Sequence, residues 1–166
     1  KAGDNIVYPT HGVGRILTVE KFQYDLVEEQ LYVIQFFQDK LTIRVPFSKV
    51  KLIGLRDITS KPTMARTLSN LKQKPKIKKA MWSRRAQEYD QKINSGKIYE
   101  LAEVVKDLNK NSDIIADQSY SERQLFEKAY ERLKSEFEAV LKVSPEEVQK
   151  KMDKALGRTQ ISETAE

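Results

Sequence analysis

The sequence predicts an α+β protein in two parts: a small five-stranded β-barrel over residues 1–58, followed by a compact bundle of about five helices over residues 59–158. Three observations support this prediction. Apolar residues alternate with a period of two in the first part, they recur at helical spacing in the second, and the period changes between residues 56 and 61. Residues 159–166 are expected to form a disordered tail.

Five short segments rich in β-branched and apolar residues predict the strands of the first part: residues 6–9, 13–19, 29–37, 41–45 and 50–53. The third segment is apolar on both of its faces, which is typical of a strand buried on both sides. Pro46 ends the fourth segment, and Gly54 follows the fifth. Five such strands in fewer than sixty residues predict a small closed or half-closed barrel of SH3 or Tudor type.

In the second part, residues 64–71, 78–94 and 98–108 predict three helices, and two more are expected to run to residue 141 and to residue 156. Pro75 separates the first two helices, because its ring forbids a continuous helix through this point. The helix ends carry recognisable capping residues: Gly96 after the second helix, Ser119 or Ser121 before the fourth, and Ser144 before the fifth.

The composition excludes several classes of protein. With no cysteine among the 166 residues, disulfides and thiolate metal sites are excluded. His11, the single histidine, has no second metal ligand or catalytic partner near it in the sequence, so we expect it to serve turn structure. No apolar run is long enough to span a membrane, and the N-terminus lacks the apolar segment of a signal peptide. We therefore expect a cytoplasmic, monomeric, non-enzymatic protein without cofactor, metal or membrane partner.

The net charge of +6 is concentrated in one window of the chain. Residues 61–97 carry 11 basic and 2 acidic side chains, whereas residues 98–166 carry 11 and 15. A concentrated basic patch favours a polyanionic partner such as nucleic acid, because each phosphate contact releases condensed counterions. A solvated basic linker is the alternative interpretation.

The chain's only tryptophan, Trp82, lies in this basic window at the start of a predicted helix. Its spacing to later apolar residues also fits a core position, so a buried Trp82 is the alternative. Five cations around it favour DNA instead: Lys76, Lys78, Lys79, Arg84 and Arg85. Lysine and arginine contact phosphates, and an apolar aromatic ring can wedge against a base step from the minor groove. Such contacts are expected to be independent of the DNA base sequence.

The predicted fourth strand alternates cleanly, with Thr42 and Arg44 on one face and Leu41, Ile43 and Val45 on the other. In one interpretation Arg44 is an ordinary exposed residue of the strand. In the other, the strand lies at an edge, where its free backbone groups extend a partner's sheet and Arg44 adds a charged hydrogen bond.

Six segments of the chain match a known pattern in order and spacing: residues 3–12 (GDNIVYPTHG), 41–46 (LTIRVP), 54–57 (GLRD), 82–85 (WSRR), 95–96 (SG) and 102–108 (AEVVKDL). Together they resemble the CarD family of bacterial transcription regulators, which includes the CdnL proteins. Their order and spacing make the resemblance specific, and it spans nearly the whole chain. The first part is also similar to the polymerase-interacting module of transcription-repair coupling factors, but the helical part and the lack of helicase motifs favour CarD.

The resemblance implies that the first part is a Tudor-like domain that docks by strand addition on the β1 lobe of the RNA polymerase β subunit. Thr42, Ile43 and Arg44 fall on the contacting strand, and a second basic contact falls near Lys21 and Phe22.

The resemblance further implies that the helical part contacts promoter DNA at the upstream edge of the transcription bubble. Trp82 corresponds to a minor-groove wedge, with Arg84 and Arg85 beside it on the backbone. The expected function is a transcription regulator that stabilises the promoter open complex. Two alternatives stay open on the residues alone: a stand-alone, sequence-nonspecific nucleic-acid-binding module, and a protein scaffold without DNA contact.

Overall fold

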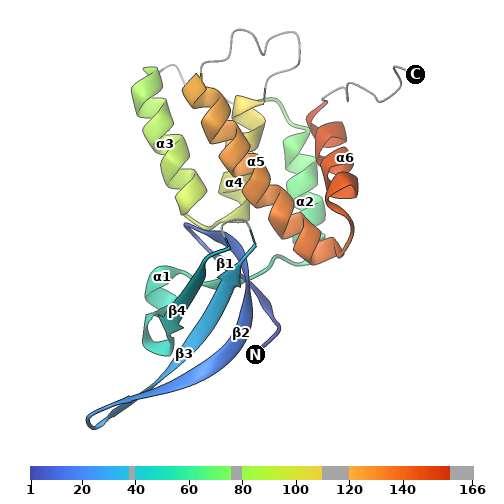
Figure 1. Cartoon of the computed structure of the whole chain (residues 1–166). Helices are drawn as coiled ribbons and strands as arrows, with labels where there is room; N and C mark the ends of the chain where they lie inside the picture. The colour runs from blue at the N-terminus through green and yellow to red at the C-terminus, as the bar shows by residue number, and fades with distance from the viewer. Residues whose placement is uncertain (38–39, 76–79, 110–119, 158–166) are drawn as a thin grey trace. The chain divides into compact units, whose positions relative to one another are not determined.

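The computed structural model describes residues 1–37, 40–75, 80–109 and 120–157. These residues form two compact units, divided between Ile58 and Thr59, and each unit is described by itself. The first unit holds a five-stranded antiparallel sheet, and the described residues of the second form five helices, so the predicted α+β class is confirmed (Figure 1). None of the described helices is long and apolar enough to cross a membrane. The expected tail at residues 159–166 lies outside the described residues.

The sheet has the strand order β4-β3-β2-β1-β5, and every neighbouring pair is antiparallel. β4 and β5 are its two edges, so the sheet is open, and it corresponds to the half-closed form of the predicted barrel. The strands are β1 (Asn5–Tyr8), β2 (Gly12–Tyr24), β3 (Val27–Phe36), β4 (Thr42–Pro46) and β5 (Arg56–Asp57).

The prediction of a strand at residues 50–53 is wrong. Val50–Ile53 forms a single helical turn, α1, which follows the 3-10 turn η1 (Phe47–Lys49). Gly54 ends α1 in the left-handed conformation, with a φ of 86°, and its N–H donates to the carbonyl of Val50. A short apolar run does not distinguish a strand from a helical turn, and the glycine that follows suits a helix end. The fifth strand is instead Arg56–Asp57, which pairs with β1.

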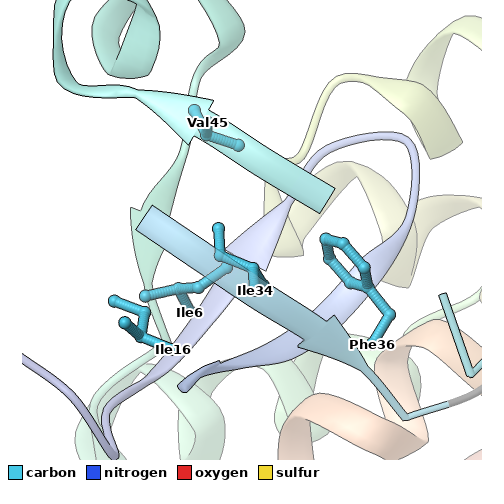
Figure 2. Packing of buried hydrophobic residues seen from close by; sticks show 5 residues of the cluster. All are labelled: Ile6, Ile16, Ile34, Phe36 and Val45. Atoms are coloured by element: carbon cyan, nitrogen blue, oxygen red, sulfur yellow. The ribbon is translucent and has the colours of Figure 1, made fainter. Parts of the chain in front are cut away.

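One face of the sheet carries the core of this unit. Its buried members come from four strands, and Figure 2 shows their side chains: Ile6, Ile16, Ile34, Phe36 and Val45. Val33, the neighbour of Ile34 in β3, is also buried, so β3 is buried on both faces as predicted.

Gly14 in β2 lies directly against this core. A Cβ added at this position would come within 2.7 Å of Ile34 Cγ2 and 2.9 Å of Phe36 Cδ1. Both neighbours are fully buried, so neither side chain can move aside without disturbing the packing. The backbone of β2 can therefore approach β3 here only because residue 14 has no side chain.

We expect Gly14→Ala to lower the free energy of unfolding by about 2 kcal/mol, the usual penalty for overpacking a core. Urea titration followed by circular dichroism measures this loss. Gly3→Ala is the matched control, because a Cβ there meets no atom closer than 4.0 Å. Its only cost is the strain of an alanine backbone held at a positive φ of 91°. That strain is about 1 kcal/mol. A Gly14→Ala variant as stable as the wild type would contradict the packing argument.

β2 and β3 are longer than the predicted strands and continue beyond the rest of the sheet as a two-stranded hairpin (Figure 1). The chain reverses at Asp25, which has a φ of 52°. The register of β2 shifts between Ile16 and Thr18, as expected for a β-bulge. One extra residue reverses the faces on which the later β2 side chains lie, so Glu20 and Phe22 point away from the core face.

In the second unit, α4 and α5 pack against each other, α3 packs on both of them, and α2 contacts α4, α5 and α6. The five predicted helices are all present, although α3 begins at Trp82 rather than near residue 78. Their bounds are α2 (Lys61–Leu71), α3 (Trp82–Asn94), α4 (Ile98–Leu108), α5 (Tyr120–Leu141) and α6 (Pro145–Leu156).

The predicted caps at Ser144 and Gly96 are confirmed. Ser144 Oγ accepts a hydrogen bond from the Glu147 N–H, and Gly96, with a φ of 77°, follows the end of α3. Lys92 Nζ donates to Glu103 Oε2 at 2.9 Å and so ties α3 to α4. Burial alone would lower the pKa of Lys92, but the hydrogen bond and charge of Glu103, helped by Asp107 and Tyr89, raise it overall. Lys92 therefore keeps its charge at neutral pH.

Candidate protein- and nucleic-acid-binding sites

β4 lies at one edge of the sheet, as strand addition requires. The Phe36 N–H donates to the Leu41 carbonyl at 2.9 Å, and hydrogen-bonded and non-bonded pairs alternate along an antiparallel ladder. The N–H and C=O groups of Thr42 and Arg44 therefore point away from β3. The backbone nitrogen of Pro46 also points away from β3. Because proline has no N–H, this position costs the sheet no hydrogen bond.

The side chains of Thr42 and Arg44 are exposed, whereas Ile43 is half-buried and packs against the core. Arg44 Nε lies 3.2 Å from Glu20 Oε2, and the two side chains are 58% and 44% exposed. An ion pair at such exposure contributes about 0–1 kcal/mol. Arg44 can therefore exchange Glu20 for a partner's carboxylate with little loss. Of the three polymerase contacts predicted on β4, the side chains of Thr42 and Arg44 point to solvent and that of Ile43 points to the core.

Lys21, the other predicted polymerase contact, lies on the opposite face from Arg44. Glu20 reaches Arg44, and successive side chains of a strand alternate in face, so Lys21 points to the other side and Phe22 to the side of Arg44. The bulge before Thr18 produces this arrangement. The structure thus brings Phe22, rather than Lys21, onto the face that carries Arg44.

The hairpin formed by β2 and β3 exposes a group of apolar side chains that the sequence did not predict to lie together. Tyr24 is 68% exposed and Leu26 is fully exposed, with Phe22 and Val27 also open to solvent. The rings of Phe22 and Tyr24 stack, with centroids 6.3 Å apart and an interplanar angle of 9°. A cluster of exposed apolar side chains is typical of a protein-binding surface. It was missed because the strand was predicted to end at residue 19.

Trp82 is the first residue of α3, and its side chain is half-buried. Its indole Nε1–H donates to Ser121 Oγ, in the first turn of α5, at 2.8 Å. The indole also lies beside the buried ring of Tyr89, with centroids 6.3 Å apart. Trp82 is therefore neither an ordinary core residue nor an unrestrained side chain. One edge of the ring is held by α5, and part of its surface is open to solvent.

Arg84 and Arg85 are neighbours in α3 with different surroundings. Arg84 is exposed, whereas the guanidinium carbon of Arg85 lies 5.4 Å from the Trp82 ring centroid and 5.7 Å from that of Tyr89. These distances fit cation–π contacts with both rings. Arg85 Nε is buried without a hydrogen-bond partner among the described residues. Arg85 thus directs its charge at the aromatic rings, and Arg84 is the one whose charge faces solvent.

Lys76, Lys78 and Lys79, the remaining predicted DNA contacts, lie outside the described residues. Met81, immediately before Trp82, and Tyr120, immediately before Ser121, are both exposed. Through the bond to Ser121, the surroundings of Trp82 include α5, which the sequence did not predict.

Within the described ranges, no group of three or more acidic, histidine or cysteine side chains could hold a metal ion. His11 packs against the rings of Tyr8 and Phe36, at centroid distances of 4.9 and 5.3 Å. The backbone N–H of His11 donates to the backbone carbonyl of Tyr8 at 3.0 Å, which confirms the predicted role in a turn.

Two protein-domain models match the chain, one in each unit. Residues 1–59 match the CarD-like/TRCF RID domain, and residues 66–153 match the CarD C-terminal domain. The chain is also similar to a protein of Bacillus subtilis (strain 168) described as "Putative transcription factor YdeB". That similarity amounts to 31% identity over 146 residues, which cover 88% of this chain and 95% of the relative. The chain therefore belongs to the CarD family of transcription regulators.

Proposed function

We propose that the protein binds the β subunit of RNA polymerase through the edge of its sheet and stabilises the promoter open complex through sequence-nonspecific contacts of its helical unit. Residues 1–58 serve as the docking domain, and residues 59–158 as the DNA-contacting domain. The observation that carries the proposal is the β4 edge, where Thr42 and Arg44 turn both their backbone groups and their side chains outward.

Docking uses the outward groups of β4. A strand from the β1 lobe of the polymerase β subunit pairs with the outward-pointing N–H and C=O groups of Thr42 and Arg44, which extends the antiparallel sheet by one strand. The Arg44 side chain supplies a charge-assisted hydrogen bond. Phe22 and Tyr24, on the same face, offer apolar area that a partner can bury.

DNA contact uses the surface around Trp82, at the upstream edge of the bubble. The exposed part of the indole wedges against a base step from the minor groove, and Arg84 contacts a phosphate beside it. The lysines of the basic window, Lys76, Lys78 and Lys79, add further phosphate contacts. None of these groups reads a base edge in the major groove, so the contacts are sequence-nonspecific.

The protein acts by preferring one state of the promoter complex over another. A factor with equal affinity for the closed and open complexes would not change their ratio. A preference of about 1.4 kcal/mol for the open complex raises the opening equilibrium constant roughly tenfold. Docking on polymerase also holds the DNA-contacting surface at a high effective concentration, so weak intrinsic DNA affinity suffices. The protein then works as a monomer and without catalysis, in the cytoplasm where polymerase meets the nucleoid.

The test is the lifetime of open complexes on a ribosomal RNA promoter, measured after a heparin challenge with and without the protein. We expect the protein to lengthen this lifetime. An unchanged lifetime would contradict the proposal. Tight binding of short duplexes by the protein alone at physiological salt would instead favour the stand-alone nucleic-acid-binding module.

The two neighbouring arginines of α3 give a matched test of which side chains contact phosphate. We expect Arg84→Ala to reduce the slope of log K against log salt concentration by about 1, as for the loss of one phosphate contact. Arg85→Ala is expected to leave the slope nearly unchanged, because the Arg85 charge faces the two aromatic rings. Fluorescence anisotropy with a labelled duplex, between about 50 and 200 mM salt, measures both slopes. Equal reductions in the two variants would contradict this division of roles.

A further inference from the structure

We propose that Ser121, in the first turn of α5, is a positioning residue that holds the Trp82 indole in the orientation in which it meets DNA; this inference rests on the proposed wedge role of Trp82. The two residues are 39 positions apart, and Trp82 Nε1 donates to Ser121 Oγ at 2.8 Å. The indole nitrogen is a donor only, so a hydroxyl oxygen at this distance is a suitable acceptor.

Three contacts hold the ring. Ser121 holds its Nε1 edge, the Arg85 guanidinium lies over the ring, and Tyr89 lies beside it. Tyr89 is buried and belongs to the same helix, so it offers a fixed surface, whereas Ser121 comes from another helix. The hydrogen bond from α5 therefore restrains the rotation of the indole in a way that contacts within α3 alone do not.

The hydrogen bond to Ser121 also restrains the N-terminus of α3. Met81 occupies the N-cap position and makes no side-chain hydrogen bond to the helix. Helix N-termini leave backbone donors unsatisfied and fray when no side chain caps them. Because Trp82 is the first residue of α3, its bond to Ser121 also ties this uncapped end to α5. The bond thus restrains both the side chain and the helical turn that carries it.

A restrained indole is useful for wedging. A side chain that is mobile in the free protein loses conformational entropy when it inserts, and that loss subtracts from the affinity. A ring already held in position avoids much of this loss, and supporting hydrogen bonds are a common means of holding a binding residue. Ser121 thereby contributes to open-complex stability without touching DNA itself.

The first test uses the intrinsic fluorescence of the free protein, because Trp82 is the only tryptophan in the chain. We expect Ser121→Ala to raise the acrylamide quenching constant of Trp82 about twofold, with lower steady-state anisotropy, since a typical hydrogen bond is lost. Ser121→Thr keeps the hydroxyl and is expected to match the wild type. Ser83→Ala, which removes the exposed serine hydroxyl next to Trp82 in the sequence, is the control. Unchanged quenching in Ser121→Ala would overturn the proposal.

The second test is the open-complex lifetime with full polymerase. We expect Ser121→Ala to shorten the lifetime about threefold, the effect of one hydrogen bond at an exposed site, and Ser121→Thr to restore it. A lifetime that is unchanged or longer in Ser121→Ala would overturn the positioning role, because the bond would then be irrelevant to insertion or would hold the indole away from DNA. If Trp82→Ala itself has no effect on lifetime, the proposed function fails, while the quenching experiment still decides whether Ser121 holds the ring.

Discussion

Arg44→Glu is expected to weaken binding to RNA polymerase by about a hundredfold or more, the loss produced by truncating or reversing one partner of a charged contact at an interface. The variant removes the charge-assisted hydrogen bond of Arg44 and places two carboxylates side by side, because Glu20 lies 3.2 Å from the Arg44 Nε. The Arg44 side chain is 58% exposed, so its loss leaves the fold nearly unaffected.

Pull-down of polymerase with immobilised protein measures the effect, and Lys21→Glu is the matched control. Both substitutions reverse one exposed charge on the sheet, but Lys21 lies on the face opposite Arg44. We expect Lys21→Glu to retain binding. Equal losses in the two variants would contradict docking through the face of Arg44, and retained binding by Arg44→Glu would contradict docking at this edge.

A further variant in the same experiment isolates the backbone contribution. Thr42→Pro removes an N–H that points away from β3, so it leaves the sheet's own hydrogen bonds intact. Ile43→Pro, one residue along, removes an N–H on the side facing β3 and is expected to disturb the fold. If docking uses strand addition, Thr42→Pro binds polymerase poorly while its thermal unfolding stays close to that of the wild type.

The periodicity of the sequence predicted most of the fold because it reflects burial directly. The five helices of the second unit follow from apolar residues at helical spacing, and Ser144 and Gly96 marked helix ends through their local chemistry. α1 was missed because four residues, three of them apolar, are too few to show a helical period. The open edge of the sheet depends on which strands pair, and pairing joins residues far apart in sequence.

The position of Lys21 could not be predicted from alternation alone. A bulge adds one residue to the strand, and no particular residue type marks it in the sequence. Every later side chain of β2 then lies on the opposite face from the one that alternation predicts. Arg44 and Glu20 meet across β3 only in the register that results.

The surroundings of Trp82 were partly predictable. Arg85 follows Trp82 by three positions and precedes Tyr89 by four, and residues at these spacings face each other on a helix. Arg84, two positions after Trp82, falls on another side. The role of Ser121 carries no such signal, because 39 residues separate it from Trp82 and only the packing of α3 on α5 brings the two together.

Trp82→Ala is expected to shorten the open-complex lifetime about tenfold, since a wedge that unstacks one base step is worth a preference of this size. The variant leaves the β4 edge untouched, so we expect its affinity for polymerase to stay within about twofold of the wild type. Heparin-challenge kinetics measure the lifetime, and the pull-down measures the affinity. A lifetime equal to that of the wild type would contradict the wedge role.

Trp82→Phe separates the aromatic ring from its hydrogen bond. Phenylalanine keeps an apolar ring for wedging but has no N–H to donate to Ser121, so we expect a lifetime between those of the wild type and Trp82→Ala. If the hydrogen bond acts only through the indole, adding Ser121→Ala to Trp82→Phe shortens the lifetime no further, because the bond is already lost. Fully additive effects of the two substitutions would show that Ser121 contributes to the open complex by a route that does not pass through Trp82.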